Sequence, residues 1–273
     1  MQKSCPQVIL IASIWAVTGQ PVTAQSLLLR PEYTSVSIAN AAGNRPGRLA
    51  PNTIFTIYGT NLSNFKWAIR PEDLLANRLP TATPNGEVYV QLQGFRLPLF
   101  FVSPTQINAL VPADFLAGDL ILQVYRDLTR GPAATVTINN EAPEIFRRDA
   151  EFAAATHADG RVITAELPAE ADEIIVIYGT GFGPLKSYGA NLPVPDRAIE
   201  VKRAADYRIR IDGEELAASS IQYVGITPGF AGLYQVNVRL PKQLDTNVRV
   251  ELGMEGNWSG PTVRLFTRKT ATN

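Results

Sequence analysis

The feature that most constrains this chain is an internal repeat. The string TIFTIYGTNL at residues 53–62 returns in altered form as EIIVIYGTGFG at residues 173–183. Further along, Gly94 corresponds to Gly213, and the Gln-Ile-Asn of residues 106–108 corresponds to the Gln-Val-Asn of residues 235–237. The repeating unit is therefore a domain rather than a solenoid repeat, and the second copy is about ten residues longer around residues 225–232.

The segments after each copy of this motif have the pattern of β-strands. Residues 87–94 and 206–213 alternate apolar and polar side chains, as strands with one buried face do. Turn sequences such as Asn-Gly and Asp-Gly separate the segments, and the best helical candidate, residues 70–79, is long enough for only one or two turns. We therefore predict an all-β chain of two β-sandwiches. The expected strands are 87–94, 99–112, 119–127 and 132–139 in the first copy, and 206–213, 221–241, 247–255 and 261–266 in the second.

The same strings resemble a known domain family. LAPNTIFTIYGTNL (residues 49–62), VYVQLQG (88–94) and LFFVSPTQINALVP (99–112) resemble the immunoglobulin-like IPT/TIG domain. IANAAG (38–43), IYGTGFGP (177–184) and GLYQVNV (232–238) together resemble a family of uncharacterised secreted bacterial domains, usually found at the C-terminus of longer proteins. The resemblance covers residues 36–267. It implies two tandem immunoglobulin-like β-sandwich domains in a secreted protein, and it brings no active-site residues.

Domain limits follow from the repeat and from the link between its copies. We expect an N-terminal segment at 25–35, a first domain at 36–140, a second domain at 141–267 and a tail at 268–273. The link near residues 138–146 is short and has no Gly/Ser run. The two domains should therefore keep a preferred angle.

The N-terminal residues have the order of a secretory signal peptide. Lys3 precedes an apolar run from Val8 to Val17, and a stretch of small residues ends at Ala24. The apolar run is too short to span a bilayer. We predict a signal peptide at residues 1–24, cleaved after Ala24, and a mature protein that is secreted or held at the cell envelope without a membrane span. A buried strand or a short membrane anchor is the alternative.

The single cysteine leads to a first testable prediction. Cys5 lies ahead of the apolar run and should be lost with the signal peptide, which leaves the mature chain without a disulfide. The purified mature protein should therefore have the same melting temperature with and without a reductant. A marked shift would mean that Cys5 is retained and forms an intermolecular disulfide bond.

Charge and composition narrow the classes of partner. Lysine and arginine total 25, and aspartate and glutamate also total 25, with no long run of either sign. Nucleic acid and anionic membrane surfaces are therefore poor candidate partners. A histidine-rich metal site is not expected, because the chain has one histidine and one cysteine, and we predict no cofactor.

The two Tyr-Gly-Thr corners have two interpretations. A phosphate-binding loop would need a helix after its glycines, and Lys186 would supply the charge. The prolines and further glycines that follow oppose such a helix. We therefore assign Gly59, Gly179 and Gly181 a structural role, in which they permit a positive φ at the bend after a core strand.

Catalytic residues are few. His157 precedes an Asp-Gly turn and is expected to be an exposed hairpin residue, and no nucleophile elbow or zinc-binding helix is present. Carboxylates gather at Glu170, Asp172 and Glu173 and again at residues 214–215, at strand ends where acids are ordinarily solvated. We predict that the protein is not an enzyme. A secreted carbohydrate-active enzyme, or its carbohydrate-binding accessory, is the alternative.

Two tryptophans are candidate ligand-binding residues. Trp67 and Trp258 fall outside the alternating strand patterns, and an exposed indole is a suitable platform for a sugar ring or a protein partner. Alternatively, each caps the end of a sandwich core. The sequons at Asn61 and Asn257 are too short a motif to assign glycosylation. The resulting functional hypothesis is a non-enzymatic module that binds a protein or polysaccharide outside the cell.

Overall fold

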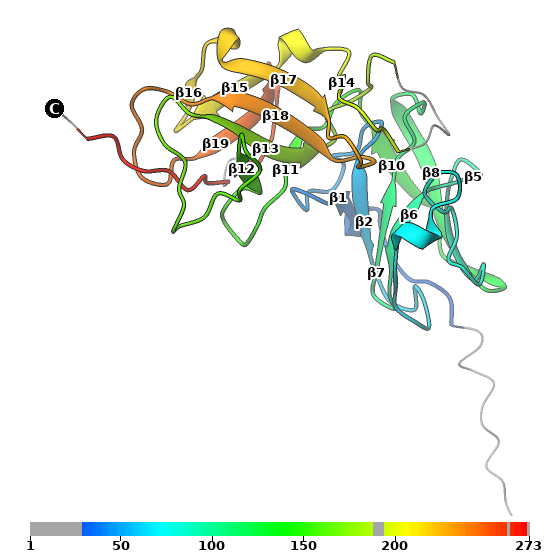
Figure 1. Cartoon of the computed structure of the whole chain (residues 1–273). Coiled ribbons are helices and arrows are strands. Elements are labelled where there is room, and N and C mark those ends of the chain that lie inside the picture. The colour runs from blue at the N-terminus through cyan, green and yellow to red at the C-terminus, as the bar shows by residue number, and fades with distance from the viewer. Residues whose placement is uncertain (1–28, 188–193, 261–262, 272–273) are drawn as a thin grey trace, which may run out of the picture.

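A computed structural model describes residues 29–187, 194–260 and 263–271 (Figure 1). The predicted signal peptide and Cys5 lie outside these residues. Within these residues the strand ladders are antiparallel and no α-helix is present, which confirms the all-β prediction. The helical elements within the described residues are 3₁₀-helices of three residues each: η2 (Ser35–Ser37), η3 (Pro71–Asp73), η4 (Ala204–Asp206) and η5 (Ala218–Ser220).

Two sheets packed face to face form what we call the N-terminal sandwich. One sheet has the order β1 (Ile38–Asn40), β2 (Ile54–Tyr58), β7 (Gln106–Leu110), β6 (Leu99–Val102), β3 (Trp67–Ala68). The other has the order β10 (Ala134–Ile138), β8 (Gly118–Arg126), β4 (Val88–Leu92), β5 (Phe95–Arg96), and β9 (Thr129–Arg130) pairs with β8. These orders match the A-B-E-D and G-F-C strands of an immunoglobulin domain, which confirms the predicted immunoglobulin-like topology.

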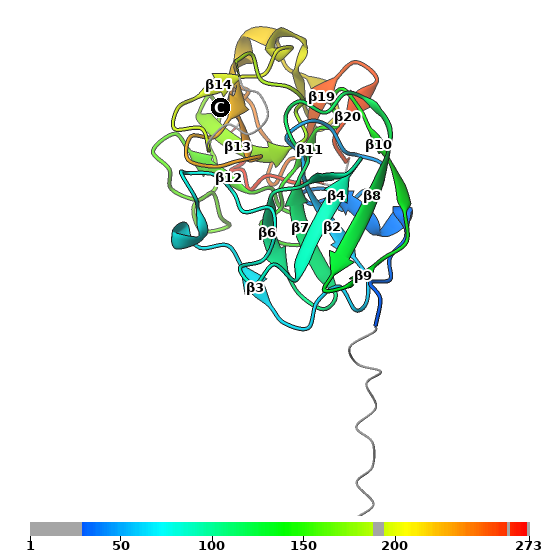
Figure 2. The same ribbon diagram turned by 90° about the vertical axis from the view of Figure 1, so that its right-hand side faces the viewer.

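Period-two alternation explains why these segments pair as they do. In β4, Val88, Val90 and Leu92 are buried in the core, whereas Tyr89 and Gln91 point to the outer face. The same alternation in β8 and β10 gives their sheet one apolar and one polar face. Figure 2 shows β4, β8 and β9 side by side in this sheet. The sheet therefore presents a regular outer surface to solvent.

Residues 144–258 form a second pair of sheets, the C-terminal sandwich. Its larger sheet has the order β11 (Glu144–Ile145), β13 (Ile174–Thr180), β18 (Tyr234–Arg239), β17 (Ile221–Ile226), β14 (Ile199–Glu200), and β12 (Ala155–His157) pairs with β13. The smaller sheet has the order β16 (Glu214–Glu215), β15 (Arg208–Ile211), β19 (Val250–Met254), β20 (Asn257–Trp258). Each sandwich encloses its own hydrophobic cluster. The domain limits given above stay predictions.

The repeat in the sequence is reproduced in the structure. Gly94 and Gly213 both have a positive φ, 82° and 92°, in the hairpins β4–β5 and β15–β16. The repeated Gln-x-Asn motif also makes the same contact twice: each glutamine Nε2 donates to the asparagine Oδ1 two residues on, at 2.8 Å in β7 and 3.0 Å in β18. The two copies therefore share this side-chain contact as well as most of their strand order.

One expected strand is absent. Of the predicted strand 261–266, residues 261–262 lie outside the described residues, and Arg264 makes only isolated bridges, to Phe152 and to Arg249. Its backbone nitrogen donates to the Glu151 carbonyl, while Val250 donates to the Val263 carbonyl. Because the backbone alternates between two partner segments, no continuous ladder forms. The prediction of a strand here was wrong.

Some of the extra residues of the second copy lie at the junction of the sandwiches. The turn between β6 and β7 spans residues 103–105, whereas the loop between β17 and β18 spans residues 227–233. Gly232 in this loop lies against Ile54 and Leu110 of the N-terminal sandwich, and its carbonyl accepts a 2.8 Å hydrogen bond from Thr180 Oγ1. The insertion predicted near residues 225–232 is thus a longer loop that fills the space between the two halves.

A buried polar network also joins the sandwiches. The Glu144 carboxylate, whose side chain is 2% exposed, accepts hydrogen bonds from Arg45 at 2.8 Å and from Arg48 at 3.1 Å. Arg48 also donates to Asn257 Oδ1 at 2.6 Å, and Thr180 Oγ1 accepts from the Ile54 amide at 2.9 Å. In Figure 1 the sandwiches meet at an angle near β1 and β11. These contacts support the preferred angle predicted from the short link.

Candidate ligand-binding surface

The outer face of sheet β10-β8-β4-β5 carries a row of half-buried tyrosine and glutamine side chains. Tyr89 faces Tyr125, and Gln91 faces Gln123, as directly paired residues of β4 and β8. Each of these four side chains alternates with a buried core residue on its own strand. The strand pattern therefore directs all four to the same outer surface.

The two tyrosines form a stack. Their ring centroids lie 4.7 Å apart with an interplanar angle of 7°. The Arg96 guanidinium carbon lies 4.0 Å from the centroid of Tyr89, in cation–π geometry. Because β4 lies between β5 and β8, Arg96 and Tyr125 approach Tyr89 from opposite sides. Both faces of Tyr89 are therefore occupied, and the rings are held in position by the sheet.

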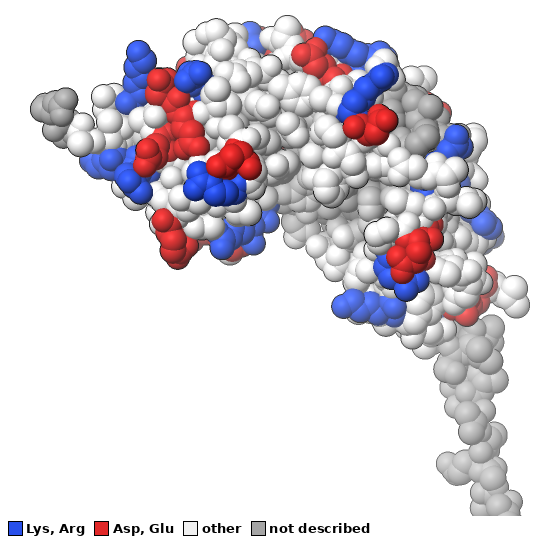
Figure 3. Space-filling model, viewed as in Figure 1, with Lys and Arg blue, Asp and Glu red and all other residues white. Residues whose placement is uncertain are grey.

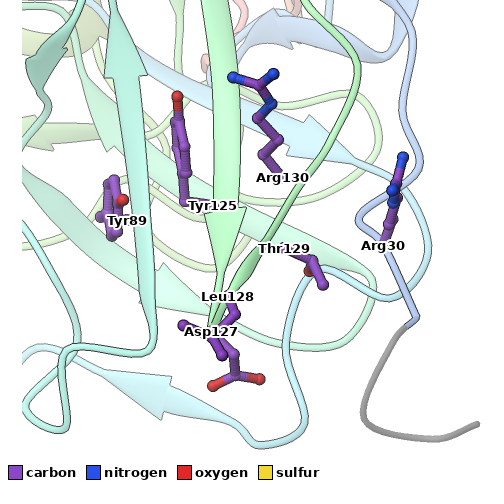
Figure 4. A pocket seen from close by; sticks show the side chains of 7 residues that line it. All are labelled: Arg30, Tyr89, Tyr125, Asp127, Leu128, Thr129 and Arg130. Carbon is purple, nitrogen blue, oxygen red and sulfur yellow. The ribbon is translucent and has the colours of Figure 1, made fainter.

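A cavity of about 650 Å³ opens beside this stack (Figure 4). In Figure 4 the two tyrosines stand side by side, the Arg130 side chain extends next to Tyr125, and Arg30 lies on the N-terminal segment across the opening. The fully exposed Leu128 sits at the β8–β9 turn. This volume is in the usual range for small-ligand sites, roughly 300–1,000 Å³. The lining residues are Arg30, Tyr89, Tyr125, Asp127, Leu128, Thr129 and Arg130.

The arginines around the stack are not neutralised by acids. No carboxylate within the described part of the chain lies within ion-pair distance of Arg30, Arg96 or Arg130. The one acid that lines the cavity, Asp127, lies 3.8 Å from the nitrogen of a different arginine, Arg126. The surface therefore combines aromatic rings with an excess of positive charge.

Elsewhere, opposite charges lie next to one another. On the face shown in Figure 3, blue and red side chains are interspersed and no patch of a single sign covers a sandwich. Many charged side chains of the described residues form ion pairs, such as Arg203 with Asp206 at 2.7 Å and Arg161 with Asp159 at 2.7 Å. The tyrosine surface differs in that arginines without an ion pair among the described residues lie beside stacked aromatic rings.

Trp258 lies at the corresponding place in the C-terminal sandwich. Trp258 pairs with Gly253 in the hairpin β19–β20, and Arg130 pairs with Tyr125 in the hairpin β8–β9. Trp258 and Arg130 therefore occupy equivalent positions in the two copies of the repeat. The Arg210 guanidinium carbon lies 3.7 Å from the indole centroid, and Arg210 lies 3.8 Å from Glu215. Trp258 lines a cavity of about 590 Å³. One face of the indole is therefore covered by a paired arginine.

Trp67 lies on the opposite sheet of the N-terminal sandwich, in the edge strand β3. It is partly buried and packs against the hydrophobic core, as expected of a residue that caps the core. The two predicted tryptophans belong to different sheets of different sandwiches. Their roles in binding stay predictions.

The glycines of the Tyr-Gly-Thr corners serve two different purposes. Gly181 has a φ of +81°, as predicted. Gly59 and Gly179 are not among the residues with positive φ, so the prediction was wrong there. At both positions a Cβ would overlap a backbone carbonyl oxygen, that of Glu32 at Gly59 and that of Glu144 at Gly179. These two glycines are required by the close approach of a neighbouring segment.

The contacts of Lys186 do not favour the phosphate-loop interpretation. Its ammonium group pairs with Glu200, and the described residues after Gly181 contain no α-helix. Within the described ranges, no group of three or more potential ligands is placed to hold a metal ion, and no helix is both long and apolar enough to cross a membrane.

His157 is buried, which corrects the expectation of an exposed hairpin residue. It is 6% exposed, its Nδ1 lies 2.5 Å from Glu173 Oε1, and its Nε2 lies 3.4 Å from the Leu167 carbonyl oxygen. The hairpin folds back over the sheet because residues 155–157 pair with β13. The neighbouring acids are also partnered, Glu170 by Arg268 at 3.1 Å and Asp172 by Arg239 at 3.5 Å.

The sequons fall at structured positions. Asn61 has a φ of 55° beside the first Tyr-Gly-Thr corner. The Asn257 amide donates a 2.7 Å hydrogen bond to the Glu141 carbonyl and accepts one from Arg48. Asn257 therefore takes part in the contacts that join the two sandwiches.

The sequence contained a signal for the tyrosine surface. In residues 88–92 and 122–126 the tyrosines stand at the positions that the alternation assigns to the solvent-facing side of the strand. A large aromatic ring at such a position indicates a surface that binds something. Pairing of the two segments, which decides that the rings meet, depends on strand register and was not predicted.

Comparison with known proteins reveals distant structural similarity only. No family model matches the sequence, and no curated protein matches it. Among solved structures, SGBP-B of the Bacteroides ovatus mixed-linkage glucan utilization locus, in complex with a heptasaccharide, is 11% identical over 81% of this chain and 44% of that chain, with a TM-score of 0.32. The plexin A4 extracellular region is 12% identical over 88% and 16%, with a TM-score of 0.27. A titin tandem is 10% identical over 88% and 64%, with a TM-score of 0.23. The chain therefore spans less than half of the first of these structures.

Proposed function

We propose that this protein is a non-enzymatic binding module that acts outside the cytoplasm and holds a polysaccharide on the Tyr89–Tyr125 surface. The observation that carries the proposal is the tyrosine stack beside a cavity. Aromatic rings fixed by a sheet provide a rigid apolar contact for a sugar ring and lose little entropy on binding. Gln91 and Gln123, on the same surface, offer amides to sugar hydroxyls. A protein ligand is the other partner class that the sequence left open.

The proposal includes the context expected from the sequence. Two IPT/TIG-like domains at 36–140 and 141–267 would follow a signal peptide cleaved after Ala24, in a protein secreted or held at the envelope. The polar contacts at the junction support this proposal, because they would hold the tyrosine surface at a constant orientation to the rest of the protein.

The hydrolase alternative has its best candidate group near His157. This group comprises Glu170, Asp172 and Glu173 beside a cavity of about 450 Å³. Each of these carboxylates already has a cationic or hydrogen-bonding partner. An acid and a base that must exchange protons with a substrate would need to leave these partners, which supports binding rather than catalysis. Release of reducing sugar from any bound polysaccharide would instead favour the hydrolase.

Replacing Tyr125 by alanine should weaken binding to the preferred polysaccharide by about tenfold or more, because the ring is the central contact of the surface. The ligand would first be found on a glycan array, and the dissociation constant then measured by titration calorimetry. Tyr125→Phe should bind nearly as well as the wild type, since it keeps the ring.

Tyr58→Ala is the matched control, because Tyr58 is an exposed tyrosine on the opposite sheet. Unchanged melting temperatures would show that all variants fold. If Trp258→Ala or Trp67→Ala abolished binding and Tyr125→Ala did not, the ligand site would lie at that tryptophan and the Tyr89–Tyr125 surface would be excluded.

A further inference from the structure

We infer that the ligand of the tyrosine surface is an acidic polysaccharide whose carboxylates are bound by Arg130 and Arg30, while a sugar ring packs against Tyr125. This inference rests on the proposed function and adds the chemical class of the ligand. It depends on three features of the cavity: its unpaired arginines, the side of the stack on which they lie, and its size.

The first feature is the charge. Arg30 and Arg130 line the cavity, and neither has a carboxylate partner among the residues that the structure describes. A guanidinium group offers two parallel N–H donors that match the two oxygens of a carboxylate. Two such groups across one opening form a site for an anion, which a neutral glucan would leave unused.

The second feature is the geometry of the stack. Tyr89 is enclosed between Arg96 and Tyr125, so it has no free face for a ligand. Tyr125 has Tyr89 on one side and lines the cavity with Arg130, its direct neighbour on β9. Figure 4 shows the Arg130 guanidinium level with the outer end of the Tyr125 side chain. A sugar that touches Tyr125 would thus bring a carboxylate on its ring within reach of Arg130.

The third feature is the size of the site, which favours a polysaccharide over an acidic protein. The cavity of about 650 Å³ suits one or two sugar residues. A stable protein partner would need a buried area of roughly 1,000 Å² or more, with an apolar centre. Here the polar groups line a single hollow.

The test uses two polyuronates, polygalacturonate and alginate, with fully methyl-esterified polygalacturonate as the neutral polymer of identical backbone. The wild type should bind at least one polyuronate, and binding to the methyl ester should be about tenfold weaker or lost. Arg130→Gln and Arg30→Gln should each weaken polyuronate binding by about tenfold. Added salt should also weaken binding of the polyuronate to the wild type, because it screens the charges. Arg161→Gln, which removes an exposed arginine of the C-terminal sandwich, should bind as the wild type does.

The outcomes separate this inference from the proposed function. Suppose that the wild type and Arg130→Gln bind a neutral polysaccharide equally well while Tyr125→Ala loses that binding. This result would keep the proposed function and overturn the inference that the ligand is acidic. Failure to bind either polyuronate would also overturn it. Equal binding of poly-glutamate would indicate an acidic protein as the partner instead. If no polysaccharide on the array bound, both proposals would fail.

Discussion

Replacing Glu144 by alanine should lower the free energy of unfolding by about 3 kcal/mol, because it leaves the partly buried Arg48 charge without its partner. The Glu144 carboxylate accepts hydrogen bonds from Arg45, Arg48 and, at 3.1 Å, the Gly260 amide. Burial is the main influence on Arg48 and lowers its pKa, while the charge of Glu144 raises it. The charge of Glu144 therefore offsets part of the cost of burying the Arg48 guanidinium.

This change should also separate the unfolding of the two halves. Arg45 and Arg48 belong to the N-terminal sandwich, and Glu144 belongs to the C-terminal one. Without their link, each sandwich should unfold in its own transition, so a two-state fit that describes the wild type should fail. Urea denaturation, followed by tryptophan fluorescence and by circular dichroism, measures both effects.

The matched control is Glu170→Ala, which removes an exposed ion pair with Arg268 in the same sandwich. Its cost should be about 1 kcal/mol or less. If Glu144→Ala unfolded at the same urea concentration as Glu170→Ala, the network at the junction would contribute nothing measurable to stability. A rigid angle between the sandwiches would then need another cause.

Replacing Gly179 by alanine should cost about 3 kcal/mol, the upper part of the usual range for overpacking. The new methyl group would overlap the Glu144 carbonyl oxygen and would lie 2.7 Å from the Phe182 ring. Phe182 is fully buried and packs against Tyr207 and Tyr234, so it has no room to retreat. Strand β11 would have to move away from β13, and the melting temperature of the C-terminal sandwich should fall.

Gly160→Ala separates steric overlap from backbone strain. Gly160 has a φ of +87°, and a Cβ there would meet nothing within 4 Å. The cost should therefore be only that of placing an L-residue in the left-handed region, roughly 1–2 kcal/mol. If the two substitutions cost the same, the close contact at Gly179 would not be the reason for its glycine.

Much of the fold could be predicted because its signals are local. The alternation in residues 87–94 reports which side chains face the core, and the Gln-Gly and Asp-Gly turns after the strands beginning at Val88 and Arg208 report where the chain reverses. The internal repeat shows the same order of strands and turns a second time, which supports the same fold for both copies. These patterns depend on the period of the backbone and on residue size, which are present in the sequence itself.

The wrong predictions concern contacts between distant segments. The residues next to His157 in the sequence predicted an exposed side chain, but Glu173 and Leu167 enclose it. Residues 263–266 have the alternation of a strand, yet the 151–153 segment takes part of their hydrogen bonding. Gly179 was assigned a positive φ, although it is the approach of β11 that excludes a side chain there. In each case the deciding neighbour is remote in the sequence.

The sequence by itself determined the fold class, the repeat and the turns, because these depend on neighbouring residues along the chain. The tertiary structure alone decided where the chain can bind and how its halves are joined. Tyr89 and Tyr125 lie 36 positions apart and meet only through the register of β4 and β8. Arg48 and Glu144 meet only because the two sandwiches pack against each other. Register and packing are properties of the whole fold, and no local pattern specifies them.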